Sequence, residues 1–299
     1  MLTTLKNRKT LSSPTFIEEA AARGDIIEGM AISCDAAHNL SVDLGCMKGI
    51  IPRCEGAIGI SEGAVRDIAL ISRVGKPVSF IIDGFTTDRA GNRLVLLSRR
   101  KAQEKCRKEY ISKLSTGDII PATVTHLESF GAFCDIGCGI VALLPIDSIS
   151  VSRITHPKDR FGCGENIKTV VKSITADRIT LSMKVLLGNW QENAESFSQS
   201  ETVSGIVRSV ESYGIFVELA PNLAGLAESK PGVSVGEQAS VYIKSILPDK
   251  MKIKLIIIDS FETDCKRLPI KYFNTCSHID RWLYSPEGCA KTVETRFDI

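Results

Sequence analysis

The sequence predicts a mainly β protein built from three tandem five-stranded barrels that short helices join. The first observation is a unit that recurs: residues 129–137 (SFGAFCDIG) are echoed at residues 212–220 (SYGIFVELA) and, more faintly, at residues 38–45 (HNLSVDLG). The copies follow one another every 80 to 95 residues or so, a spacing of about one domain and too long for a solenoid repeat. The second observation is that apolar residues form short β-branched runs separated by Gly, Asp and Pro, which indicates strands with turns between them.

The second copy shows the order of the strands most clearly. The expected strands cover residues 123–127, 130–136, 140–144, 167–174 and 178–182, with a turn at residues 175–177 before the last one. A polar stretch at residues 147–165 makes the connection between the third and fourth strands the longest. Five short strands in roughly 70 residues with this spacing fit a Greek-key barrel of the OB type.

Two segments between the copies have helical spacing instead. Apolar residues recur about every fourth position in residues 99–114 and again in residues 186–197, which predicts helical connectors that pack on the barrels. Trp190 lies on the second apolar stripe, so we expect it in the core rather than stacked on a base. The predicted division of the chain is an N-terminal segment 1–23, a barrel 24–100, a helical linker 101–116, a barrel 117–184, a helical linker 185–199, a barrel 200–260 and an unassigned tail 261–299.

The charge of the chain is nearly balanced. Lys and Arg number 37 against 35 Asp and Glu, a net charge of +2, well short of the strongly basic composition that marks many nucleic-acid binders. If the partner is RNA, base stacking and repeated weak sites must supply much of the affinity, because linked modules raise one another's effective concentration.

The composition favours a soluble cytoplasmic protein. Residues 1–10 are polar and basic with no apolar segment suited to a signal peptide, and no apolar run approaches the length of a membrane span. The ten cysteines have irregular spacings without a CxxC pair, so reduced thiols are the simplest expectation.

Catalytic motifs are absent from the sequence. It contains no Walker-type phosphate loop, HExxH, GxSxG or dinucleotide fingerprint, and no acidic cluster suited to a two-metal nuclease. The cysteine and histidine spacings fit no zinc pattern. We therefore expect no enzymatic activity, no cofactor and no bound metal.

The two aromatic residues around a glycine are the strongest chemical signal. A base stacked on an aromatic ring contributes about 1–3 kcal/mol with little sequence preference. Strict strand alternation puts residues three apart on opposite faces, so Phe130 and Phe133 can share a surface only if Gly131 permits a bulge or a sharp twist. The alternative is that one ring of each pair belongs to the core.

The second and third copies resemble the S-one domain, the OB-fold RNA-binding module named after ribosomal protein S-one of the bacterial small subunit. The first copy is similar in outline only, so the resemblance covers about residues 24 to 260. In the second copy it rests on Gly117-Asp118, Val124, Phe130-Gly131-Ala132-Phe133, Gly139, Leu143-Leu144 and Arg178-Ile179-Thr180-Leu181-Ser182. The third matches at Val203-Ser204-Gly205-Ile206-Val207, Tyr213-Gly214-Ile215-Phe216, Gly225-Leu226 and Lys252-Ile253-Lys254-Leu255.

The resemblance implies particular RNA-binding residues. They are Phe130, Phe133 and Arg178 in the second copy, and Tyr213, Phe216 and Lys252 in the third. The family's usual histidine is replaced by Pro145 and by Glu228, and its usual aspartate by Thr175. Glu228 would repel phosphate, and Lys252 cannot form the planar fork of an arginine. The further candidates for base or phosphate contacts are His126, Lys172, Lys184, Arg208, Lys244 and Lys254.

The sequence therefore predicts a non-catalytic protein that binds single-stranded RNA, including mRNA, and acts in translation at the small ribosomal subunit. The short, clostridial-type relatives of ribosomal protein S-one have this arrangement of modules. The first copy keeps neither aromatic, with His38 and Ser41 in their places, and the resemblance suggests a protein contact at the ribosome for it. Two alternatives stay open: an accessory RNA-binding protein of RNA decay or transcription, and a metal or redox protein that uses the cysteines.

Overall fold

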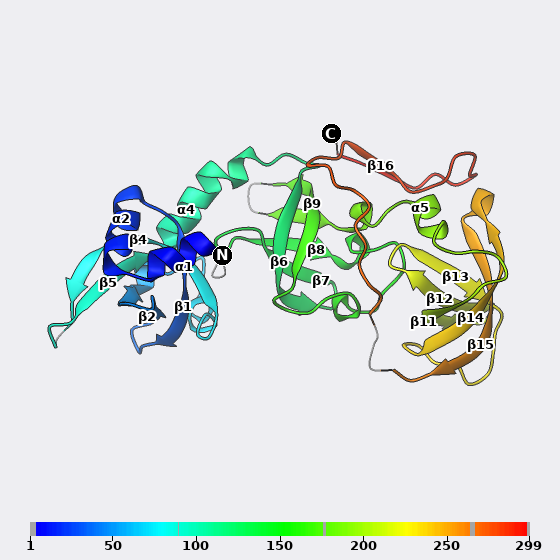
Figure 1. Cartoon of the computed structure of the whole chain (residues 1–299), viewed down its shortest axis with the longest axis horizontal. Helices are drawn as coiled ribbons and strands as arrows, with labels where there is room; N and C mark the ends of the chain where they lie inside the picture. Colours follow the sequence, from blue (N-terminus) through cyan, green and yellow to red (C-terminus); the bar gives the residue numbers. More distant parts are fainter. Residues whose placement is uncertain (1–3, 89, 176–177, 264–266, 298–299) are drawn as a thin grey trace. The chain divides into compact units, whose positions relative to one another are not determined.

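The computed structural model describes residues 4–88, 90–175, 178–263 and 267–297 of the chain (Figure 1). Its described residues form three closed barrels of five strands each. The first barrel contains β1 (Ile27–Cys34), β2 (Leu40–Asp43), β3 (Lys48–Ile51), β4 (Pro77–Thr87) and β5 (Arg93–Ser98). The second contains β6 (Ile119–Glu128), β7 (Gly131–Asp135), β8 (Val141–Pro145), β9 (Asn166–Ile174) and β10 (Ile179–Ser182). The third contains β11 (Thr202–Glu211), β12 (Gly214–Ala220), β13 (Leu223–Ala227), β14 (Gln238–Leu247) and β15 (Lys252–Phe261).

All three barrels have one topology. The strands pair in the order first, second, third, fifth, fourth, and the fourth returns to the first to close the sheet. The third and fifth strands are parallel, as in the pair Leu143 and Thr180, while the other pairs are antiparallel. This confirms the predicted fold class, including a complete barrel in the first copy, where the resemblance is weakest.

Each barrel carries β-bulges at matching places. One interrupts the first strand opposite the second, at Thr125 in the second barrel and Arg208 in the third. Another interrupts the fourth strand opposite the fifth, at Asp83, Lys172 and Lys244 in the three barrels. Because a bulge adds twist and bends its strand, these repeated positions let short strands close into a barrel.

Short helices precede the first barrel, follow the first and second barrels, and interrupt the loops within them. They are α1 (Leu5–Leu11), α2 (Pro14–Arg23), α3 (Ile68–Ile71), α4 (Arg99–Glu109) and α5 (Trp190–Ala194), with 3-10 turns η1 (Arg53–Glu55), η2 (Ile111–Lys113), η3 (Ile146–Ser148), η4 (Pro157–Asp159), η5 (Lys184–Leu186) and η6 (Pro248–Lys250). The connector predicted at 186–197 is helical over five residues only, and Asn189 caps it in a capping box with Glu192. Among the described helices, none is long and apolar enough to cross a membrane.

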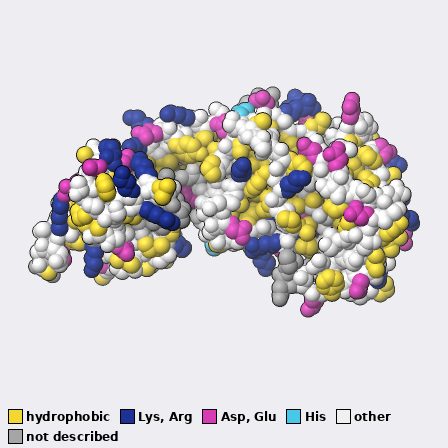
Figure 2. All heavy atoms as spheres, in the orientation of Figure 1, with side chains coloured by type: hydrophobic (Ala, Val, Ile, Leu, Met, Phe, Trp, Pro, Cys, Tyr) yellow, Lys and Arg dark blue, Asp and Glu magenta, His cyan; other side chains and the backbone are white. Residues whose placement is uncertain are grey.

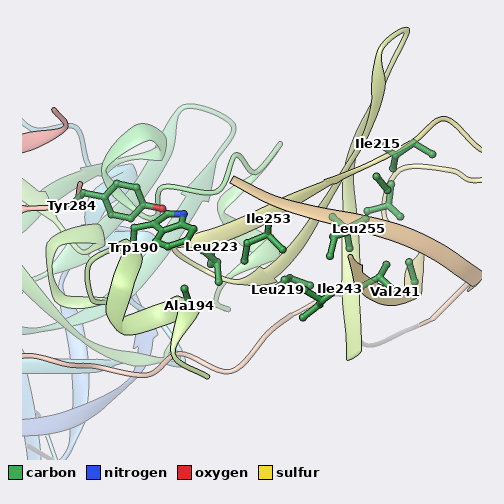
Figure 3. Packing of buried hydrophobic residues seen from close by; sticks show 14 of the residues in the cluster. Trp190, Ala194, Ile215, Leu219, Leu223, Val241, Ile243, Ile253, Leu255 and Tyr284 are labelled. Carbon is green, nitrogen blue, oxygen red and sulfur yellow. The ribbon is translucent and has the colours of Figure 1, made fainter. Parts of the chain in front are cut away.

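The contacts divide the chain into two compact units, residues 1–114 with 137–140, and residues 115–136 with 141–299. The first has its own core, formed by residues of the first barrel together with α2, α3 and the loop between β3 and β4. In the second, one apolar cluster fills the third barrel and extends to Trp190 and Tyr284, which are labelled side by side in Figure 3. Trp190 is 2% exposed, so the prediction that it belongs to the core is confirmed.

The C-terminal segment, for which the sequence predicts no structure, belongs to the second unit. It contains a two-stranded sheet of β16 (Arg281–Leu283) and β17 (Glu294–Arg296). Ile279 N–H donates to the Gly117 carbonyl (2.9 Å), and Phe273 N–H donates to the Leu186 carbonyl (2.9 Å). The segment thus contacts the start of the second barrel and the connector after it (Figure 1).

Candidate nucleic-acid interface

The first aromatic pair lies at the hairpin that joins β6 and β7. Ser129 and Phe130 form its two-residue turn, and Phe130 is 54% exposed. Phe133 follows on β7 and is partly exposed. The two ring centroids are 6.0 Å apart and the rings are nearly perpendicular, at 87°. Both rings are therefore accessible, and neither belongs to the core.

The third barrel repeats this geometry. Tyr213 lies in the turn between β11 and β12 and is 68% exposed, while Phe216 on β12 is partly exposed. Their ring centroids are 6.2 Å apart at 85°. The recurrence of one edge-to-face pair on two barrels, with both rings reaching solvent, is the arrangement expected of a base-stacking surface.

The glycine between the aromatics has a different role from the one predicted. The predicted bulge is not at Gly131: Phe130 precedes the strand, so alternation does not apply to it, and the bulge lies in the facing strand at Thr125. A Cβ on Gly131 would lie 2.5 Å from the Leu144 carbonyl oxygen, and one on Gly214 would lie 2.5 Å from that of Ala227. Glycine therefore allows the aromatic hairpin to approach the third strand closely.

His126 adds a third ring to the second barrel. It pairs with Phe133 across β6 and β7, with ring centroids 6.4 Å apart and planes inclined by 22°. Its Nε2 is 2.7 Å from Glu128 Oε1, which holds the imidazole in place. The third barrel has Ser209 opposite Phe216, so the two aromatic surfaces are not identical.

The two candidate cations at the start of the last strand, Arg178 before β10 and Lys252 on β15, occupy equivalent positions. Thr180 pairs with Leu143, and Lys254 pairs with Leu226 in the same parallel register. Arg178 and Lys252 each lie two residues before that point, and both are exposed. Leu143 on β8 is partly exposed and pairs with Phe133 on β7. β8 therefore lies between β10 and the strand that carries the aromatic ring.

The lysine candidates fall into two groups. Lys172 and Lys184 lie together at η3, where Lys172 Nζ donates to Ser148 Oγ and Lys184 Nζ to the Asp147 carbonyl, each at 3.1 Å. Lys244 and Lys254 are exposed on the third barrel, with Lys244 Nζ 3.8 Å from Glu228 Oε1. On the face drawn in Figure 2, Lys and Arg side chains are interspersed with Asp and Glu, which agrees with the balanced composition.

Arg208 does not lie on the surface, contrary to its prediction as a phosphate contact. Its side chain is 8% exposed, its Nε lies 2.5 Å from Glu218 Oε2, and its Nη1 is 3.8 Å from Asp159 Oδ2. Glu218 also pairs with Arg160 from the second barrel, and neither of these side chains is exposed. Burial lowers the pKa of Arg160, and the Glu218 carboxylate opposes that shift. These charged side chains therefore form ion pairs at the interface between the second and third barrels.

This network between the second and third barrels is absent from the sequence prediction. Asn222, fully buried, completes it: its Oδ1 accepts from Val151 N–H (3.0 Å), and its Nδ2 donates to the carbonyls of Lys184 (2.7 Å) and Gly188 (2.8 Å). Sequence spacing could not reveal the contacts of Arg160 with Glu218 and of Arg208 with Asp159, because each joins residues of different barrels. The two aromatic pairs are consequently carried by barrels that share a polar interface.

The first barrel lacks the aromatic surface. Ser41 pairs with Ser33 just after the bulge, the register position of Phe133 and Phe216. His38 lies before β2 with φ of 62°. The position of Arg178 and Lys252 is taken by Leu94, two residues before Leu96, which pairs with β3. Among the described residues, no three His, Cys, Asp or Glu side chains are grouped as metal ligands.

Comparison with known proteins finds a matching domain family and several similar curated proteins. Residues 113–184 match the S1 (S-one) RNA binding domain. The chain is 29% identical to small ribosomal subunit protein bS1 of Leuconostoc lactis, over 81% of this chain and 55% of that protein. It is 28% identical to the protein of the same name from Staphylococcus aureus, over 83% and 65%. A bS1 homolog of Bacillus cereus is 31% identical over 58% and 50%.

The chain thus spans about half to two thirds of the length of the curated relatives it matches. The S1 match coincides with the barrel that carries Phe130, Phe133 and His126. Residues 113–184 thus match the S1 RNA binding domain within a tandem array of OB-type barrels, and over most of its length the chain is similar to bacterial small ribosomal subunit protein bS1.

Proposed function

We propose that this chain binds single-stranded RNA, including mRNA, through its second and third barrels and acts in translation at the small ribosomal subunit. The observation that carries the RNA-binding part is the repeated exposed pair, Phe130 with Phe133 and Tyr213 with Phe216, at nearly the same distance and angle. Aromatic faces bind unpaired bases with little sequence preference. Arg178 and Lys252 are the proposed phosphate contacts at equivalent strand positions.

Direct titration tests the RNA-binding part. A fluorescently labelled single-stranded RNA and the same strand annealed to its complement are titrated with the full chain at one fixed salt concentration, because affinities depend steeply on salt. The proposal expects tighter binding of the single strand, whose bases are free to stack. Equal binding of the two forms, or no binding of either, contradicts it.

The ribosomal part rests on similarity to proteins named small ribosomal subunit protein bS1. Sedimentation of a cell extract on a sucrose gradient tests it, with the chain detected by a specific antibody. Migration with the small subunit is expected. Absence from that fraction, with RNA binding intact, favours a role in RNA decay or transcription.

The first barrel is proposed to contact protein rather than RNA. It lacks both aromatics, and backbone hydrogen bonds between Ala31 and residues Gly75 and Lys76 bring together the segments that carry the exposed Ile32 (50%) and Val74 (39%). Exposed apolar residues gathered in this way are typical of protein interaction sites. A ribosomal protein of the small subunit is the proposed partner, and cross-linking from Ile32→Cys in purified subunits would identify it.

A further inference from the structure

The corner between the third strand and the turn after it differs in charge between the first two barrels. Pro52 and Pro145 end this strand segment in the respective barrels, and a three-residue 3-10 turn follows each, η1 and η3. The last residue of the turn is Glu55 in the first barrel and Ser148 in the second. One carboxylate of the first barrel is thus replaced by a hydroxyl.

The bulge beside this corner shows a second replacement. It holds Asp83 in the first barrel and Lys172 in the second, at the same register position against the fifth strand. In the first barrel, Glu55 accepts from Arg100 Nη2 (2.7 Å), and Asp83 pairs with Lys101. Each of these two acids is thus matched by a base.

The corner of the second barrel lacks this balance. Lys172 and Lys184 donate to the Ser148 hydroxyl and to the Asp147 carbonyl, which are uncharged oxygens. Among the described residues, the exposed Asp147 is the acid whose charge favours the protonated form of Lys184. The Asp147 carboxylate also accepts a hydrogen bond from Ser148 Oγ at 3.1 Å. Two ammonium groups therefore face one carboxylate. Burial and then the charge of Lys172 lower the pKa of Lys184, so an additional anion here would relieve the repulsion between the lysines.

The lysine pair adjoins the aromatic hairpin. Ile146, the first residue of η3, donates its N–H to the Phe130 carbonyl (2.9 Å), and the lysines bond to the next two residues along the turn. The turn that bonds to the aromatic hairpin thus also holds both lysines. We propose that Lys172 and Lys184, held by η3, form a binding site for a phosphodiester of single-stranded RNA that anchors the strand whose bases stack on Phe130 and Phe133. This inference rests on the proposed function.

The salt dependence of RNA affinity tests this site. For single strands, the slope of log affinity against log salt falls by about 0.7 for each phosphate that the protein no longer neutralises. The wild-type chain and the double variant Lys172→Gln, Lys184→Gln are titrated with labelled single-stranded RNA over a series of potassium chloride concentrations, after circular dichroism shows both folded. The variant is expected to bind more weakly for every RNA sequence tested and to have a slope smaller by about 0.7 or more.

Two further variants sharpen the test. Lys172→Asp recreates the acid of the first barrel at the bulge and places it beside Lys184, so the decrease in slope should match or exceed that of the double variant. Lys244→Gln alters the same register position in the third barrel, where Glu228 already lies nearby, and should change the slope less. If the wild type binds RNA and neither the double variant nor Lys172→Asp changes the salt-dependence slope, the proposed phosphate site is refuted. Failure of the wild type to bind RNA refutes the proposed function instead.

Discussion

Arg160 of the second barrel and Glu218 of the third form an ion pair from which solvent is excluded on both sides. Arg160 Nη1 donates to Glu218 Oε2 at 3.1 Å, and Ser150 Oγ accepts from Arg160 Nε and Nη2. Glu218 lies on β12 two residues after Phe216. The pair thus connects the strand of one aromatic surface to the neighbouring barrel, and we expect it to hold the two surfaces in a fixed arrangement.

Removing the charge of Glu218 should destabilise the chain strongly. Glu218→Gln keeps the shape but leaves the buried Arg160 without its counter-charge, and breaking a buried pair in this way costs about 3–5 kcal/mol. The free energy of unfolding from urea denaturation measures it. Glu228→Gln, at a surface acid that is 88% exposed, is the matched control and should change stability by about 0.5 kcal/mol at most. Equal effects of the two substitutions contradict the role assigned to the pair.

Gly214→Ala should disturb the aromatic hairpin of the third barrel. The added Cβ would meet the Ala227 carbonyl oxygen at 2.5 Å, and the φ of +151° suits few residues other than glycine. We expect a decrease in stability of about 1–3 kcal/mol and weaker RNA binding, because Tyr213 and Phe216 flank this residue. Gly232 also has a positive φ, but a Cβ added there would have no atom within 4 Å. Gly232→Ala therefore measures the cost of backbone strain without a steric clash. If both variants are destabilised equally, the close approach is not the reason for the glycine.

Stability should depend on pH through His278 in the C-terminal segment. Its hydrogen bond with Asp118 (2.7 Å) raises the pKa of the imidazole above its ordinary value near 6.5, with Asp280 adding to the effect. Because the pKa is higher in the folded state, protonated His278 stabilises the fold. This contribution is complete at pH values below the pKa of the unfolded state, and it is lost as the pH rises through the pKa of the folded state. The effect should be modest, because the side chain is 39% exposed.

The measurement is the difference in thermal midpoint between wild type and His278→Gln, taken between about pH 5.5 and 8.5. This difference should be largest at the acidic end and shrink as pH rises. A difference that is constant with pH, or that grows toward alkaline pH, contradicts the assignment.

The sequence predicts the barrels well because their signals are local. Alternating apolar residues and turn residues define strands such as residues 166–174 without knowledge of the rest of the fold, and the aromatic hairpin is a contiguous motif. The structure of the tail cannot be predicted in this way, because it depends on packing: Ile279 reaches Gly117, far away in sequence. The prediction for Arg208 is wrong for a related reason. In the sequence, an arginine on a strand has no visible partner and is interpreted as a surface cation. In the fold, the neighbouring barrel places Asp159 beside Arg208 and Arg160 against Glu218, the acid that also pairs with Arg208.

The four rings of the two aromatic pairs are expected to stack on RNA bases, and titration of labelled single-stranded RNA measures their contribution. The variant Phe130→Ala, Phe133→Ala, Tyr213→Ala, Phe216→Ala is compared with the wild type at one salt concentration, with folding checked by circular dichroism. Each stacked base contributes about 1–3 kcal/mol, so removal of even two stacks should weaken binding by about thirtyfold or more. A folded variant whose affinity equals that of the wild type would contradict the account.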